Sequence, residues 1–176
     1  MSTQQTASVQ PVPYRFVDDG AIPNNSRLPL LVYPGVLRFG NEDPAVVAEA
    51  RFAQNGWGGL WRNGIFPFPH YHSEAHEALA ICRGRAAVRF GGAQGIVLEV
   101  QPGDVVVIPA GVGHENLGAS ADLLVVGAYP PGQQPDLCYG KADERLAVLQ
   151  NIPEVVLPAT DPVYGEGGPL VDQWGG

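Results

Sequence analysis

Short apolar segments separated by glycine, proline and asparagine fill the sequence between residues 57 and 129. Each segment is long enough for a strand but too short for a stable helix, and the separating residues favour tight turns. The whole chain has 23 Gly and 17 Pro in 176 residues without a collagen-like period, which fits many turns. This pattern predicts an all-β fold, an antiparallel sandwich or barrel. The candidate strands are 57–63, 65–72, 76–82, 85–90, 96–100, 105–109, 114–117 and 123–129.

The length fits one domain, in which we expect three segments. Residues 1–28 are polar and rich in turn residues, so they are predicted to form an arm laid over the domain. Residues 29–130 are predicted to form the barrel. Residues 131–176 are predicted to form a C-terminal extension that packs on it.

Outside the candidate strands, three regular elements are expected. Residues 29–39 favour a short strand that is broken at a Pro-Gly pair. A helix is predicted to begin after Asp43, which can cap it, and to end at Asn55. Residues 142–149 favour a short second helix, and the chain from residue 152 is expected to be ordered loop.

The charge of the chain excludes some partners. Ten Lys+Arg against eighteen Asp+Glu give a net charge of −8, so we expect neither a nucleic acid nor an anionic membrane surface as partner. The first twenty residues lack the apolar core of a secretory signal, and no apolar run reaches the roughly 18 residues of a membrane span. Cys82 and Cys138 are far apart, which favours free thiols over a disulfide. These features predict a cytoplasmic protein.

All four histidines lie between residues 70 and 114. His70 and His72 are two apart on a candidate strand, so their side chains project from one face. On the next strand Glu77 shares a face with apolar residues, where a carboxylate is costly unless it is paired or binds a metal. His76 falls on the opposite face, which favours Glu77 as the ligand. His114 opens a later strand that a barrel can bring near the others.

Three imidazoles and one carboxylate suit one divalent first-row transition metal. The residue types leave the choice among Fe, Mn, Ni, Zn and Cu open. The spacing of these residues resembles the two motifs of the cupin superfamily. The first motif is matched by Gly64, His70, His72, Glu77 and Gly84, and the second by Gly103, Pro109, Gly111 and His114. The asparagine that ends the second motif in the family is replaced by Gly118.

A closer resemblance extends over most of the chain. Residues 55–76, 108–118 and 161–170 are similar to the small single-domain bacterial cupins called YjlB-like, for which we know of no assigned reaction. The resemblance implies a cupin jelly-roll β-barrel (double-stranded β-helix) with one or two short flanking helices. It also implies one metal site formed by His70, His72, Glu77 and His114, and a homodimer. It names no substrate.

Several other residues have a functional and a structural interpretation. Counting back by twos from His70 places Phe68, Phe66 and Arg62 on the inward face, as pocket walls and as an anchor for an anionic substrate. The alternative is that the aromatic rings belong to the core and Arg62 pairs with a structural carboxylate. Asn116 holds a metal-bound water in one interpretation and stabilises a turn in the other.

The first functional hypothesis is a metal-dependent enzyme, of dioxygenase or isomerase type, acting on a small oxygen-rich substrate. In this hypothesis Arg62 or His76 orients the substrate or moves a proton, so both are candidate catalytic residues. The alternative is a non-catalytic module that binds a metal or a metabolite. A third hypothesis, an isomerase without metal, is disfavoured by the intact ligand set.

Overall fold

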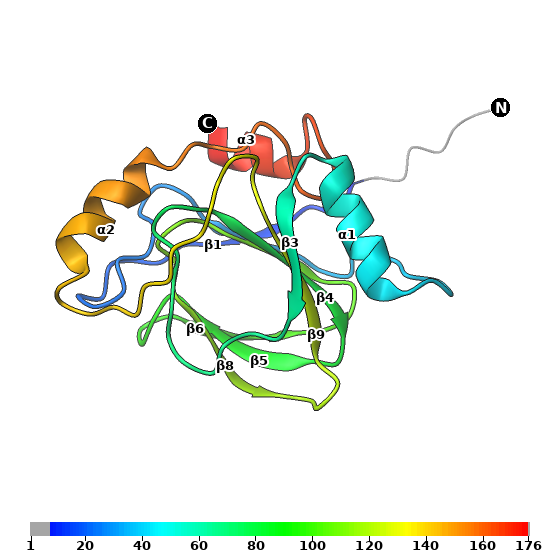
Figure 1. The fold of residues 1–176 in the computed structure, drawn as a ribbon, viewed down its shortest axis with the longest axis horizontal. Coiled ribbons are helices and arrows are strands. Elements are labelled where there is room, and N and C mark those ends of the chain that lie inside the picture. Colours follow the sequence, from blue (N-terminus) through cyan, green and yellow to red (C-terminus); the bar gives the residue numbers. More distant parts are fainter. Residues whose placement is uncertain (1–7, 176) are drawn as a thin grey trace.

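The computed structural model describes residues 8–175, which form two antiparallel sheets that face each other (Figure 1). The larger sheet has the order β1-β2-β7-β4-β9-β3 and the smaller has the order β6-β5-β8. The strands of the larger sheet are β1 (Val12–Tyr14), β2 (Leu30–Tyr33), β7 (Val105–Ile108), β4 (Glu77–Arg83), β9 (Leu124–Tyr129) and β3 (Gly58–Asn63). Those of the smaller sheet are β6 (Ile96–Val100), β5 (Ala86–Phe90) and β8 (His114–Ala119). This is the jelly-roll barrel that the sequence predicts.

Strand β4 pairs along its two edges with β7 and β9, and it is buried on both faces from Glu77 to Cys82. Leu79 and Ile81 pack inside the barrel with apolar residues of the smaller sheet. Ala78 and Ala80 belong to a second cluster on the outer face, where helices cover the sheet. Because side chains alternate along a strand, Glu77 begins β4 on the inward face, as the sequence predicts.

Helix α1 (Pro44–Gln54) packs on this outer face, beside β3 in Figure 1. It begins where the sequence predicts, because the Asp43 side chain accepts a hydrogen bond from the Ala45 amide at 2.9 Å. Phe52 is buried against the sheet, and the helix ends at Asn55. The apolar stripe of α1 therefore covers the small side chains of β4.

The C-terminal extension contains α2 (Arg145–Asn151), a short 3-10 helix η1 (Ile152–Glu154) and α3 (Pro169–Gly175). The sequence predicts α2 but assigns the α3 segment to loop. A helix of seven residues is not stable alone and depends on tertiary contacts. Its Trp174 is buried, and the indole N–H donates to the carbonyl of Pro29 at 2.9 Å.

Asp161 ties the extension to the larger sheet. Its side chain is 0% exposed and accepts four hydrogen bonds. The donors are the Tyr33 hydroxyl (2.5 Å) and the backbone N–H groups of Val163 (2.7 Å), Tyr164 (3.0 Å) and Leu170 (3.0 Å). One carboxylate therefore joins β2, the loop before α3 and the first turn of α3.

Residues 65–72 do not form the continuous strand that the sequence predicts. The segment contains two isolated bridges, at His70 and at Tyr71. Pro67 and Pro69 lack the N–H groups that a strand donates to its neighbours, so the segment is a loop apart from these two bridges.

The predicted N-terminal arm supplies β1, which pairs with β2 at the edge of the larger sheet. Residues 1–7 of that arm lie outside the described residues. Cys82 and Cys138 are buried free thiols, as predicted. Within residues 8–175, every helix is too short or too polar to cross a membrane.

Candidate metal centre

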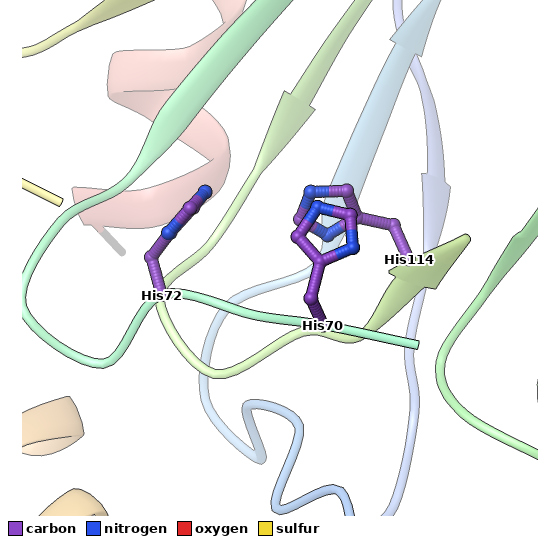
Figure 2. Close-up of side chains that lie close together, drawn as sticks. All are labelled: His70, His72 and His114. Atoms are coloured by element: carbon purple, nitrogen blue, oxygen red, sulfur yellow. The ribbon is translucent and has the colours of Figure 1, made fainter. Parts of the chain in front are cut away.

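Three histidines from separate parts of the sequence meet at one end of the barrel (Figure 2). His70 and His72 belong to the loop before β4, and His114 is the first residue of β8. One ring nitrogen of each lies within 4.8 Å of the others. Paired backbone hydrogen bonds between His70 and His114, of 2.9 and 3.2 Å, hold the loop against β8.

The backbone fixes the orientation of all three rings. In each ring Nδ1 lies at a backbone carbonyl oxygen, which can only accept a hydrogen bond, so Nδ1 carries the hydrogen. Each ring therefore leaves Nε2 with its lone pair as the metal-binding atom. The pairs are His70 with Phe68 (2.9 Å), His114 with Val112 (3.2 Å) and His72 with Asp136.

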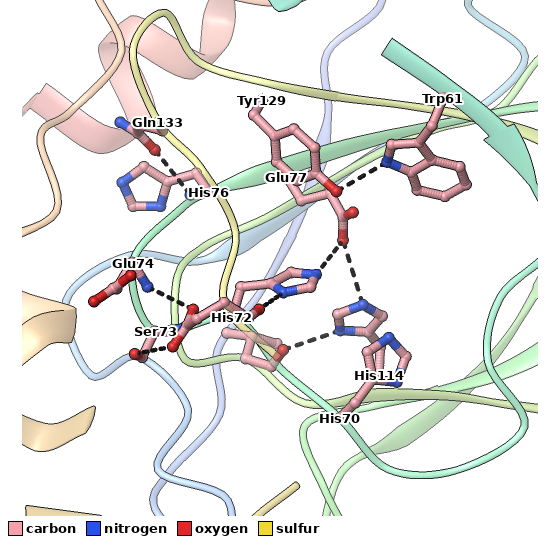
Figure 3. A network of polar contacts seen from close by, with 12 residues as sticks. Trp61, His70, His72, Ser73, Glu74, His76, Glu77, His114, Tyr129 and Gln133 are labelled. Atoms are coloured by element: carbon pink, nitrogen blue, oxygen red, sulfur yellow. Dashed lines mark hydrogen bonds and ion pairs between the residues drawn. The ribbon is translucent and has the colours of Figure 1, made fainter. Parts of the chain in front are cut away.

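Glu77 faces the same point from the start of β4 (Figure 3). Its side chain is almost fully buried, and Oε2 lies 3.3 Å from Nε2 of His72 and 3.4 Å from Nε2 of His114. A carboxylate oxygen and a nitrogen lone pair repel each other, so a positive charge belongs between them, either a proton or a metal ion.

The pKa shifts of Glu77, His72 and His70 agree with a positive charge between the carboxylate and the rings. Burial acts to raise the pKa of Glu77, but His72 and His114 outweigh it and hold the pKa below its ordinary value. Burial acts to lower the pKa of His72, but Glu77 and the Asp136 carbonyl outweigh it, so the His72 pKa is raised. Burial and the neighbouring His114 lower the pKa of His70 to about 3, which keeps this ring neutral and able to bind a metal.

The donor set fits a divalent transition metal. Imidazole nitrogen and carboxylate oxygen are ligands of Zn, Fe, Mn, Ni and Cu in proteins. His70, His72 and His114 form a group that could hold such an ion, and Glu77 offers a fourth donor beside it.

These four residues form part of the wall of a cavity of about 230 Å³ inside the barrel mouth. The four donor groups therefore border open interior space beside the site. Its other lining residues are Trp61, Asn63, Gly64, Ile65, Phe66, Leu79 and Tyr129.

Of the three predicted pocket residues, one lines the cavity and two do not. Phe66 lines the cavity and is 45% exposed. Phe68 stacks on Phe66, with ring centroids 5.0 Å apart, and is not among the lining residues. Asn116 does not line the cavity either, and its Oδ1 accepts the N–H of Gly118 at 2.8 Å. This contact lies within β8, where the pairing with β5 shifts register, so neither the cavity role nor the turn role predicted for Asn116 is seen.

Arg62 points away from the cavity, and the prediction of an inward side chain is wrong. On the outside of the sheet its guanidinium forms a bidentate ion pair with Glu49 of α1. Nε donates to Oε1 at 2.6 Å and Nη2 donates to Oε2 at 2.8 Å. Counting by twos from His70 fails because residues 64–69 are not a strand. The cavity is instead lined by Trp61 and Asn63, the residues on either side of Arg62.

His76 also lies outside the cavity, which corrects its prediction as a proton-transfer residue. It is fully buried on the outer face of the sheet, against the ring of Trp174. Its Nδ1 accepts the amide hydrogen of Ala110 at 2.9 Å, and its Nε2 has no partner among the described residues. Burial lowers the pKa of His76 to about 4, so this ring is a neutral core residue.

The sequence interpretation missed a pair of aromatic residues in the cavity. The indole N–H of Trp61 donates to the hydroxyl of Tyr129 at 2.9 Å, and this hydroxyl lies beside Glu77 (Figure 3). Burial and the nearby Glu77 charge raise the pKa of Tyr129, so the phenol keeps its hydrogen. The alternation of β9 groups Tyr129 with Gly127 and Val125, but it does not say which face is the inner one.

The sequence also gave no signal for Asp136, which positions His72 from the C-terminal extension. Its backbone carbonyl accepts the Nδ1–H of His72. Its carboxylate accepts hydrogen bonds from the backbone N–H groups of Ser73 (2.7 Å) and Glu74 (3.0 Å) and from the Ser73 hydroxyl (2.5 Å). The loop that presents His72 is thus held by a residue more than sixty positions away in the sequence.

Replacing Asp136 with alanine should weaken metal binding by about tenfold and leave the barrel folded. The variant loses the bonds that fix the carbonyl against His72, so the ring is less well oriented. Competition with a chromophoric chelator measures the change. Glu74→Ala is the control, because Glu74 is an exposed acid in the loop that carries His72 and keeps its backbone N–H in the variant. An equal loss in both variants would contradict the positioning role of Asp136.

An antiparallel barrel with three histidines and a buried carboxylate around an interior cavity defines a class of β-barrel proteins able to hold one metal ion. The family model described as Cupin matches residues 60–159, and the chain belongs to the cupin family. It is 43% identical over 161 residues to the uncharacterized protein YjlB of Bacillus subtilis (strain 168), covering 92% of this chain and 94% of that protein. Both findings agree with the resemblance in the sequence.

Two solved structures are similar in part. One is acireductone dioxygenase from Bacillus anthracis with a cadmium ion in its active centre, at 16% identity and a TM-score of 0.37, covering 51% of this chain and 61% of that one. The chain therefore spans less than two thirds of that dioxygenase. The other is an uncharacterized conserved protein with a double-stranded β-helix domain from Klebsiella pneumoniae. The identity is 14% and the TM-score 0.34, and the match covers 76% of this chain and 83% of that one.

Proposed function

We propose that this cupin is a metal-dependent enzyme, of dioxygenase or isomerase type, that acts on a small substrate bound through its oxygen atoms. The observation that carries the proposal is the convergence of His70, His72, His114 and Glu77 on the wall of an interior cavity. A purely structural metal site is normally closed by its protein ligands, whereas a catalytic one keeps a position open to substrate. The cavity beside the four residues supports the second kind.

In this proposal the four residues hold one divalent metal through three Nε2 atoms and a carboxylate oxygen. The metal supplies Lewis-acid chemistry, or the activation of dioxygen when it is iron. The backbone carbonyls at Nδ1 keep the rings oriented, and Glu77 offsets part of the metal charge. The apolar cavity wall excludes water from the bound substrate.

Elemental analysis of protein purified without a histidine tag tests the metal. We expect close to one equivalent of a transition metal per chain, or uptake of one equivalent by metal-free protein. Uptake below about a tenth of an equivalent would argue against the site.

A screen of diols, diketones, keto acids and sugar acids then tests the enzyme proposal. Oxygen consumption detects dioxygenase-type turnover, and proton NMR detects isomerisation. Turnover by the metal-loaded protein and none by the metal-free protein is the expected result. Binding without turnover across the panel would favour the non-catalytic alternative, a module that binds a metal or a metabolite.

We also propose the segment boundaries and the assembly that the sequence suggests. Residues 1–28 are the arm, residues 29–130 the barrel and residues 131–176 the extension, in a cytoplasmic homodimer. Light scattering coupled to gel filtration tests the dimer, and a monomeric mass would refute it. Limited proteolysis tests the boundaries, since cuts inside 29–130 before cuts at its ends would contradict them.

A further inference from the structure

The cavity beside the candidate metal site has an uncharged wall. Besides the four candidate ligands, every described lining residue is aromatic, aliphatic, glycine or asparagine. Leu79, Ile65 and Phe66 provide apolar surface. The volume of about 230 Å³ is below the roughly 300–1,000 Å³ typical of sites for drug-sized ligands. The space therefore suits a compact molecule with an apolar body.

Two strand arginines, Arg62 of β3 and Arg89 of β5, do not line the cavity. Arg62 pairs with Glu49 on the outer face, and Arg89 pairs with Glu115 at 2.8 Å. A ligand with a second negative charge would place it against apolar side chains without a cation to balance it, which is costly. The metal itself balances the charge of the group that binds it.

The Tyr129 hydroxyl in the cavity wall is oriented by its neighbour Trp61. The indole nitrogen of Trp61 can only donate, so the Tyr129 oxygen accepts at 2.9 Å and its own hydrogen faces the Glu77 carboxylate. That hydroxyl lines the cavity beside Glu77, one of the four candidate metal ligands (Figure 3). The side-chain Oδ1 of Asn63, by contrast, already accepts the N–H of Gly64 at 2.8 Å.

We propose that the cavity selects small ligands that bind the metal through oxygen atoms, carry a compact apolar body and bear no second charge. Tyr129, oriented by Trp61, shifts its hydrogen bond from Glu77 to an oxygen of the metal-binding group when a ligand is bound. This inference rests on the proposed metal site and narrows its substrate class. It departs from a uniformly polar substrate, such as a sugar acid or a dicarboxylate.

A pair of isosteric probes tests the ligand class. Both 5-methyl-2-oxohexanoate and 2-oxoglutarate carry the same 2-oxo acid head, and they differ in a distal isopropyl group against a distal carboxylate. Titration of each into the Co²⁺-loaded protein is followed by the visible absorption of Co²⁺. We expect the isopropyl probe to bind at least about tenfold more tightly, because its end is buried against apolar side chains.

Variants test the role of Tyr129. Tyr129→Phe should weaken binding of the isopropyl probe by about tenfold while Co²⁺ uptake stays at one equivalent. Tyr139→Phe removes the same hydroxyl from an exposed ring outside the cavity and should change neither measurement. Retained probe affinity in Tyr129→Phe would refute the hydrogen bond.

The outcomes separate the two proposals. Failure of the wild-type protein to take up Co²⁺ would refute the metal site itself. Uptake of Co²⁺ with equal or tighter binding of 2-oxoglutarate would refute the ligand class and leave the metal site standing. Uptake of Co²⁺ with no response to either probe would also refute the ligand class. The probe comparison uses wild-type protein, so it does not depend on the folding of a variant.

Discussion

Replacing Glu77 with glutamine should weaken divalent-metal binding by more than about 100-fold. Loss of an outer partner of a ligand costs roughly 10–100-fold, and here a candidate ligand loses its charge. Oε2 lies 3.3 and 3.4 Å from the Nε2 atoms of His72 and His114, so its negative charge stabilises a cation at that point. Glutamine has nearly the same volume, so the core around β4 should keep its packing.

Isothermal titration with Zn²⁺ or Co²⁺, supported by chelator competition, measures this change. The control is Glu99→Gln, the same substitution at an exposed position of β6. Circular dichroism establishes that both variants are folded. Unchanged metal affinity in Glu77→Gln would show that the three histidines bind the metal without the carboxylate.

Replacing Asp161 with alanine should reduce the free energy of unfolding by about 3–5 kcal/mol. The buried carboxylate accepts from Tyr33, Val163, Tyr164 and Leu170, and alanine leaves these donors without partners away from water. Each buried donor left unpaired costs about 1–3 kcal/mol, and partial relaxation keeps the total below the sum. For a chain of this size the midpoint of thermal unfolding should fall by roughly 10 °C.

Thermal and urea unfolding of the metal-free protein measure this effect. Asp172→Ala is the matched control, because Asp172 is an exposed residue of α3. Its loss should change the unfolding free energy by less than about 0.5 kcal/mol. A similar small change in both variants would mean that the Asp161 hydrogen bonds do not hold the extension on the barrel.

Helices and strands were predictable where the local sequence pattern agrees with the tertiary packing. Helix α1 has a capping aspartate, a proline at its first position and an apolar stripe, all of which are local signals. Helix α3 has no such independent stability and forms where Leu170 and Trp174 are buried on the barrel. The sequence analysis missed α3, and it made the opposite error at residues 65–72. There the apolar pattern predicted a strand, which Pro67 and Pro69 prevent.

For the candidate site, a two-residue period predicts side-chain direction only while the backbone stays in a strand. Glu77 was placed correctly because it belongs to β4, whereas Arg62 was not, because its position was counted across a loop. His76 was a candidate because of its neighbours in the sequence, and it lies beneath Trp174 on the outer face.

The sequence by itself determined the all-β barrel, the cupin motifs and the four residues that could share one metal. Residue type and local spacing encode these features, because turns, strand alternation and ligand chemistry depend on near neighbours. Only the tertiary structure decided what surrounds the metal site. The carbonyl of Asp136 and the Trp61–Tyr129 pair reach it from distant segments. Their positions depend on how β3, β9 and the extension pack, which no local pattern specifies.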